Sequence, residues 1–235
     1  MTIIMHDLCG ADGRRFSPYC WRVRMALAHK GLAHEARPVR FLEVPAVAGG
    51  RFKTVPVIED GDVVLNESWD IAAYLEEAYP HLPSLFGGDG GRAVSRFVQG
   101  WTDLVVHPAM AGLVVRDIAD HLGSEDRAYF VQSREARYRR SLDEVVAGRE
   151  ERVAAFRDGL APLRRLLAHQ PFLGGEGPLY ADYIVFGAFM WARTVSSFRL
   201  VAEDDAIRPW LDRCLDLHGG LARAAAGFYW RDAAA

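Results

Sequence analysis

The fold of this chain is constrained most by one feature of its sequence. A short apolar strand leads into a serine–proline pair at the start of a helix. The strand is expected at Thr2–Leu8 and the helix at Ser17–Gly31, with Pro18 in its first turn. Proline suits that turn because the N–H it lacks would be unpaired there and its fixed φ is already helical. A helix N-terminus combines unpaired N–H groups with the positive end of the helix dipole. We therefore expect the Ser17 hydroxyl to lie where an anion, such as the thiolate of a small cofactor, is favoured.

A second motif, at residues 51–65, is typical of a β-hairpin. Asp60-Gly61 is a strong turn signal, and it lies between two apolar runs. Pro56 stands at the start of the first run, where proline is tolerated in a strand. The next helix is expected over Glu67–Tyr79.

The first 86 residues alternate between strand and helix patterns. A strand is expected at His34–Arg40, followed by an irregular segment, Phe41–Gly50, that has room for a short helix. The predicted order is βαβ(α)ββα, which is the order of a small α/β sandwich.

A glycine-rich break, Phe86–Gly91, follows the first unit and is preceded by two prolines. We therefore expect one domain at 1–86 and a second at 92–235. Strand signals are weak in the second part, and long amphipathic stretches predict an all-α bundle. These stretches are Arg92–His121, Ser124–Ala147, Arg149–His169, Asp182–Ser197 and Ala206–Leu217.

Composition narrows the class of protein. The chain has 235 residues and a net charge of −3, which disfavours nucleic acid and anionic membranes as partners because both require a basic face. Its three cysteines, Cys9, Cys20 and Cys214, form neither a disulfide framework nor a metal-binding spacing. No apolar run approaches the roughly 20 residues that a transmembrane helix needs. The first residues lack a signal-peptide pattern, so we expect a cytoplasmic protein without a metal.

Taken together, Ser17-Pro18, Val55-Pro56 and Glu67-Ser68 resemble the glutathione transferase family, and most nearly its bacterial β-etherase group and the fungal relatives of that group. Similar segments occur along most of the chain, in both expected domains. They are Ser17–Arg22, Val55–Ile58, Ser68–Leu75, Phe172–Gly175, Ala181–Tyr183 and Pro209–Arg213.

The resemblance implies a fold, a co-substrate and a partner. The fold would be a thioredoxin-like domain (βαβαββα) followed by a helical bundle, with a cis bond before Pro56. Glutathione would be the co-substrate, the second substrate would be a small hydrophobic electrophile, and the protein would be a homodimer. The etherase likeness further implies cleavage of β-aryl ethers.

The same resemblance implies a glutathione site. Ser17 would donate a hydrogen bond to the thiolate, beside Tyr19. The backbone of Val55, oriented by Pro56, would bind the peptide part, as a strand edge binds an extended ligand. Glu67 and Ser68 would bind the γ-glutamyl end, and Lys53, Arg51 or Arg40 would pair with the glycyl carboxylate. Taken singly, these groups also fit an ordinary helix start and solvated surface cations.

The size of the thiolate effect can be estimated. A free thiol of this kind has a pKa of about 8.5. A hydrogen bond to the anion, worth about 1.5–3 kcal/mol, and the helix N-terminus, worth about 0.3–1 kcal/mol, could together lower that pKa by about two units. A plain N-cap remains the alternative role for Ser17.

Two other functions stay open. Cys20 lies three residues after Ser17, at the second position of a redox CxxC pair whose first cysteine is replaced. It would support glutathione-dependent thiol transfer or deglutathionylation, although such a residue also suits a buried core position. A non-catalytic carrier of glutathione and aromatic ligands is the third possibility.

The electrophile site is expected in the helical part and near Tyr19. Aromatic or soft side chains there are candidates for its lining, although each also fits core packing. They are Trp101, His107, Met110, Tyr138 and Trp191. His107 could act as an acid toward a leaving group.

One helix start departs from the family pattern. The hydroxyl residue that usually caps the helix of the second domain is replaced by Leu179, while Asp182 is kept. Because leucine is a poor cap, Asp182 is expected either to cap the helix itself or to bond the preceding loop.

Overall fold

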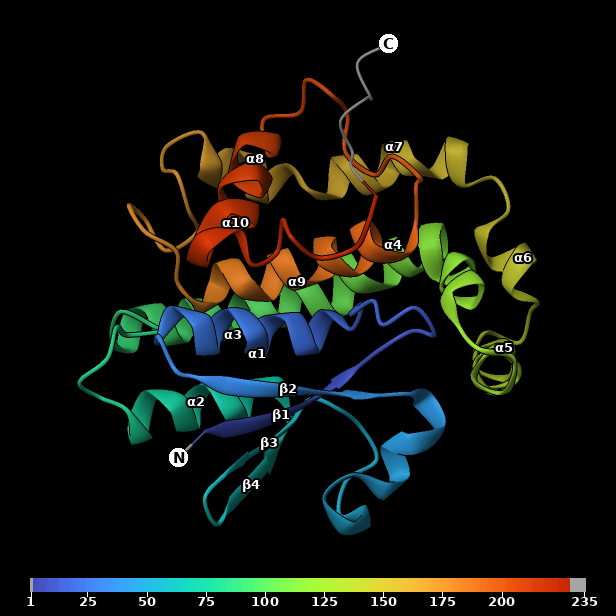
Figure 1. Ribbon diagram of the computed structural model, residues 1–235. Coiled ribbons are helices and arrows are strands. Elements are labelled where there is room, and N and C mark those ends of the chain that lie inside the picture. Colours follow the sequence, from blue (N-terminus) through green and yellow to red (C-terminus); the bar gives the residue numbers. More distant parts are fainter. Residues whose placement is uncertain (1, 229–235) are drawn as a thin grey trace.

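The computed structural model describes residues 2–228 as a four-stranded sheet followed by a helical domain (Figure 1). The strands are β1 (Ile3–Leu8), β2 (His34–Val39), β3 (Val57–Asp60) and β4 (Val63–Asn66), in the order β2-β1-β3-β4. β1 is parallel to β2 and antiparallel to β3, and β3 and β4 form the hairpin predicted around Asp60-Gly61. The expected architecture, a small α/β unit followed by an all-α part, is confirmed.

Two helices, α1 (Pro18–His29) and α2 (Ser68–Ala78), complete the first unit. The segment expected to be irregular is a 3₁₀ helix, η1 (Phe41–Gly50), with non-helical residues near its end. Figure 1 shows α1 between the sheet and α9 (Tyr180–Val195) of the helical domain, which places the start of α1 at the junction of the two parts.

Close packing of α1 on α9 depends on a glycine. A Cβ atom at Gly187, in the middle of α9, would lie 2.5 Å from the carbonyl oxygen of Pro18. Such a contact is far shorter than two atoms of this kind tolerate. The absence of a side chain at this position therefore fixes how closely the first turn of α1 approaches the helical domain.

The connection between the two parts is also fixed by a glycine. Helix α3 (Asp89–Trp101) begins three residues before the predicted start at Arg92. A Cβ at Gly91 would lie 1.8 Å from the carbonyl oxygen of Phe86, so only glycine fits there. Two of the glycines expected to break the chain, Gly90 and Gly91, therefore lie inside the first turn of the helix.

The long helix predicted over Arg92–His121 is interrupted. After α3 the chain forms a π-helical turn, η2 (Thr102–Val106), then α4 (His107–Val114) and a 3₁₀ segment, η3 (Val115–His121). Pro108 explains the start of α4, because proline donates no N–H to a continuous helix but suits a first turn.

Two other predicted stretches are also divided, one into α5 (Ser124–Tyr138) and α6 (Leu142–Val146), the other into α7 (Arg149–Gly159) and α8 (Ala161–Leu167). The last two stretches each form one helix, α9 and α10 (Arg208–Gly220). Within residues 2–228, no helix is both long and apolar enough to cross a membrane.

Asp182 ties the start of α9 to its surroundings. Its Oδ1 accepts hydrogen bonds from the backbone N–H of Leu173 (2.7 Å) and from Trp210 Nε1 (2.8 Å). Its Oδ2 accepts from the N–H groups of Gly174 and Leu179, both at 3.0 Å. The Asp182 carboxylate therefore has both predicted roles. It caps α9 by bonding the N-cap residue, and it bonds the preceding loop.

Candidate functional site

A cavity of about 540 Å³ opens where α1 begins and is lined by both parts of the chain. Seven of the predicted site residues line it: Ser17, Tyr19, Lys53, Val55, His107, Tyr138 and Trp191. The sequence reasoning therefore located the cavity, although its members come from segments far apart in the chain.

Ser17 is the N-cap of α1, and its side chain is buried, with 5% of the residue exposed. Its Oγ accepts a hydrogen bond from the N–H of Cys20 at 3.2 Å. Pro18 has no N–H, and the N–H of Cys20 is already bonded to Oγ. The hydroxyl hydrogen of Ser17 is consequently available as a donor at the cavity wall.

Val55 lines the same cavity and precedes Pro56 through a cis peptide bond, as the resemblance implied. It lies outside both ladders of β3, so strand pairing leaves its N–H and C=O available to an extended ligand. Asn66 holds this turn, because its Nδ2 donates to the carbonyl oxygens of Thr54 (2.9 Å) and Pro56 (2.8 Å).

Glu67 and Ser68 begin α2 but do not line the cavity. Glu67 is exposed and has φ +69°, a left-handed conformation that is costly for a residue other than glycine. Ser68 is buried, and its carbonyl oxygen accepts a hydrogen bond from the Tyr180 hydroxyl at 2.6 Å. The strained backbone at Glu67 is a feature that no sequence signal revealed.

The three cations proposed for the glycyl carboxylate differ in position. Lys53 lines the cavity. Arg40 is exposed and paired with Glu43 through Nη2 and Oε1 at 2.8 Å, and Arg51 is exposed beside Phe52. The geometry thus favours Lys53 over the two arginines.

Two candidates for the electrophile site lie elsewhere. Met110 is fully buried in the core, and Trp101 is half-buried at the end of α3; neither lines the cavity. These two apolar side chains pack within the helical part. The sequence could not distinguish this role from substrate binding, because core residues and binding residues have the same helical spacing.

Helix α5 supplies cavity residues that the sequence reasoning missed. The additional lining residues from this helix are Tyr129, Phe130, Arg134 and Arg137. The available signal was their spacing, because positions 130, 134 and 137 share one face of a helix with Tyr138. Phe41 of η1 faces this group, with its ring centroid 5.4 Å from that of Phe130.

His107 also lines the cavity, where it contacts Tyr19 and Trp191. The Tyr19 hydroxyl lies 3.4 Å from His107 Nδ1, and the ring centroids of His107 and Trp191 are 6.0 Å apart. Burial, together with the nearby Arg22 guanidinium, lowers the pKa of His107 to about 4, although Asp103 opposes this shift. The imidazole is therefore neutral at neutral pH, which disfavours its predicted role as an acid.

The low pKa of His107 predicts a pH-dependent stability. In the unfolded chain a histidine titrates near 6.5. Between that pH and about 4 the unfolded state binds the proton and the folded state does not, so stability falls as the pH falls. We expect the wild type to lose about 2 kcal/mol more than His107→Gln between pH 7.5 and pH 5. Urea unfolding at both pH values measures this difference, and equal losses would contradict the assignment.

Cys20 is 1% exposed, and burial raises the pKa of its thiol well above the ordinary value. A thiol in this environment remains protonated and shielded, whereas reactive cysteines have lowered pKa values and partial exposure. The geometry therefore counts against a redox role for this residue.

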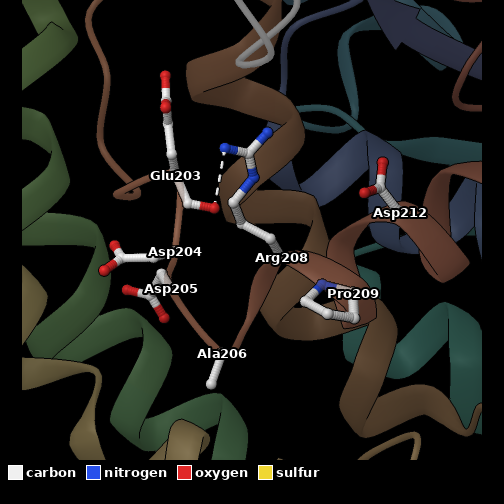
Figure 2. A pocket seen from close by; sticks show the side chains of 7 residues that line it. All are labelled: Glu203, Asp204, Asp205, Ala206, Arg208, Pro209 and Asp212. Carbon is white, nitrogen blue, oxygen red and sulfur yellow. Dashed lines mark hydrogen bonds between the residues drawn. The ribbon is translucent and has the colours of Figure 1, made fainter.

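A second hollow, at the start of α10, is acidic and contains none of the predicted site residues (Figure 2). Two of its carboxylates are Glu203 and Asp205. Asp205 forms hydrogen bonds to Arg164 (Nε, 2.9 Å; Nη2, 2.7 Å) and to the N–H of Ile207. In the part of the chain that the structure describes, no group of three or more His, Cys, Asp or Glu side chains is placed to hold a metal ion. We therefore assign this hollow a structural role.

Comparisons with known proteins show which family the chain resembles. The chain is 35% identical to glutathione S-transferase Z1 of Arabidopsis thaliana over 117 residues, 48% of this chain and 53% of the relative. The chain thus spans about half the length of this relative. It is 27% identical over 201 residues to the glutathione S-transferase-like protein ustS of Aspergillus flavus, with 73% of this chain and 72% of that protein covered.

Solved structures extend the likeness over nearly the whole chain. Glutathione transferase GSTFuA3 of Phanerochaete chrysosporium is 28% identical, with a TM-score of 0.74 over 94% of this chain and 92% of that one. Family models match residues 16–78, as a glutathione S-transferase N-terminal domain, and residues 93–216, as a C-terminal domain. On this evidence the chain belongs to the glutathione S-transferase family.

Proposed function

We propose that the protein activates the thiol of glutathione and transfers the sulfur to an aromatic electrophile. The observation that carries this proposal is the buried Ser17 hydroxyl at the amino end of α1, free to donate into a cavity that Val55 also lines. The cavity fits both halves of the reaction, because its lining combines polar groups, such as the Ser17 hydroxyl, with aromatic side chains. Glutathione is thus a co-substrate, and Ser17, Val55 and Lys53 are its main proposed contacts.

The reaction follows from this arrangement. The thiol loses its proton to solvent, and the Ser17 hydroxyl stabilises the resulting thiolate by a charge-assisted hydrogen bond. The sulfur then forms a bond to the electrophilic carbon while the bond to the leaving group breaks, and the leaving group departs with its electron pair. With an aryloxy leaving group this reaction would cleave a β-aryl ether, which is the finer activity that the sequence likeness suggested.

Product analysis tests the proposal. The protein is incubated with glutathione and either a haloaromatic or a β-aryl ether, and conjugates are identified by mass spectrometry. A thioether formed faster than in the uncatalysed control supports transfer, and release of free phenol supports ether cleavage. Tight binding of aromatic ligands without any conjugate would instead indicate the carrier function.

An exposed apolar stripe supports the predicted homodimer. Phe97 of α3 is 77% exposed and Leu104 of η2 is 79% exposed. Val94, three residues before Phe97, and Val105, next to Leu104, are exposed as well. Large exposed apolar patches on soluble proteins mark interaction sites. We propose that a second copy of this chain covers this stripe.

Introducing negative charge on the stripe should separate the subunits. Phe97→Glu combined with Leu104→Glu is expected to convert the dimer to a monomer, because each carboxylate would be buried without a partner. Sedimentation velocity measures the change. The control is Leu166→Glu, which alters an exposed leucine of α8 and should leave the assembly state unchanged. A wild-type monomer would overturn the proposal.

A further inference from the structure

The cavity contains a concentration of positive charge that the proposed reaction does not use. Three cations line it, Lys53, Arg134 and Arg137, against a single lining carboxylate, Asp103. Asp103 is already engaged, because its Oδ1 accepts from Arg22 Nη2 at 2.7 Å and lies 3.4 Å from His107 Nδ1. Lys53 lies beside Val55, where glutathione is proposed to bind. Arg134 and Arg137 are therefore the two cations that the proposed reaction does not use.

Arg134 is held in place by aromatic rings. Its guanidinium carbon lies 4.9 Å from the ring centroid of Phe130 and 5.7 Å from that of Phe41. Nη1 donates to Ser133 Oγ at 3.1 Å. Burial lowers the pKa of Arg134, and the neighbouring charge of Arg137 acts in the same direction. The environment therefore lacks the negative charge that a half-buried guanidinium ordinarily has nearby.

Arg137 lies one helical turn further along the same face of α5. Its charge reaches the Tyr19 phenol at the start of α1, where it acts to lower the pKa of that group, although burial and Asp103 raise it. Figure 1 shows α5 at the end of the molecule where β1 ends and α1 begins. Among the described residues, no carboxylate is paired with either arginine.

We propose that Arg134 and Arg137 bind a carboxylate on the electrophile, so that the preferred second substrate is an aryl acid rather than a neutral aromatic compound. The aromatic ring would lie among Phe130, Tyr138 and Trp191, with the reacting carbon toward Ser17. Arginine suits this role because its planar fork matches a carboxylate with two hydrogen bonds. This inference rests on the proposed transferase function and names the substrate class of the same cavity.

Two electrophiles that differ only in charge test the inference. They are 4-chloro-3-nitrobenzoate and 4-chloro-3-nitrobenzamide, which share a ring and a leaving group. In Arg134→Gln/Arg137→Gln we expect kcat/KM for the benzoate to fall at least about tenfold, as loss of a charge-assisted hydrogen bond predicts. The value for the benzamide and the KM for glutathione should stay within about twofold. Arg134→Lys, which keeps the charge and most of the packing, should recover part of the preference.

The matched control is Arg127→Gln, because Arg127 is on the same helix but pairs with Asp120 at 3.6 Å, outside the cavity. It should leave both electrophiles unaffected. Equal losses for the two electrophiles in the double variant would overturn the inference. A rise in the KM for glutathione would also overturn it, because the arginines would then hold the glycyl carboxylate.

Binding separates this inference from the proposed reaction. Quenching of the intrinsic tryptophan fluorescence of the protein by 4-nitrobenzoate and by 4-nitrobenzamide is measured without glutathione. Tighter binding of the benzoate, lost in the double variant, supports the inference even if the wild type converts neither electrophile and the transferase proposal fails. Equal affinity for the two ligands overturns it, whatever the activity.

Discussion

Replacing Ser17 with alanine is expected to lower kcat/KM about 10- to 100-fold and to raise the pKa of bound glutathione by one to two units. The hydroxyl is a donor at the cavity wall in the first turn of α1, where Pro18 has no N–H and that of Cys20 is bonded to Ser17 itself. A hydrogen bond to a charged group is worth about 1.5–3 kcal/mol, and one pKa unit corresponds to about 1.4 kcal/mol. The pKa is measured from the ultraviolet absorbance of the thiolate as the pH is varied.

Controls separate this effect from loss of the helix cap. Ser17→Ala also removes an N-cap, at a cost of about 1 kcal/mol of stability, so circular dichroism must show a folded variant. Ser17→Thr keeps the hydroxyl and should retain most of the activity. Calorimetry at a pH at which bound glutathione keeps its thiol proton should show nearly unchanged affinity in Ser17→Ala. Full activity in Ser17→Ala, combined with inactivity of Cys20→Ala, would transfer the catalytic role to the cysteine.

Replacing Asp182 with alanine should destabilise the protein by about 3–5 kcal/mol, because a buried group with several partners is removed. Four donors would lose their acceptor at once: the N–H groups of Leu173, Gly174 and Leu179, and the indole of Trp210. Asp182→Asn keeps one acceptor oxygen and should cost less. Urea unfolding measures both variants.

The control for this prediction is a carboxylate without such partners. Asp204 is exposed on the loop before α10, and Asp204→Ala should change stability by less than about 0.5 kcal/mol. Similar losses in Asp182→Ala and Asp204→Ala would show that the four hydrogen bonds contribute little net stability.

Local sequence signals predicted the parts of the fold that depend on local chemistry. Ser17-Pro18 marked the start of α1, and Asp60-Gly61 marked the turn between β3 and β4, because each pair constrains φ or the unpaired donors of its own segment. The interruption at Thr102–Val106 was missed, since the apolar periodicity continues across it and only Pro108 indicated a restart.

The expected site residues that line the cavity come from both sets, those named for glutathione and those named for the electrophile. Val55 and Lys53 follow from a short contiguous motif, so their position depends on one turn. The face of α5 that includes Arg134 reaches the cavity only through tertiary packing, and Trp101 was misplaced because an apolar helical residue gives the same signal in a core and in a pocket. The φ of Glu67 is imposed by its surroundings and has no signature in residue type.

The contact between Gly187 and Pro18 has a consequence for how the two halves of the chain can move. Backbone meets backbone there, so no rotamer change can absorb a displacement of one half against the other. A fragment that ends before α3 would lack α9. The first turn of α1 would then lose its packing partner, and the apolar side of α1 would be exposed. The first unit produced alone should therefore be a poorly soluble peptide and should not fold as an independent domain.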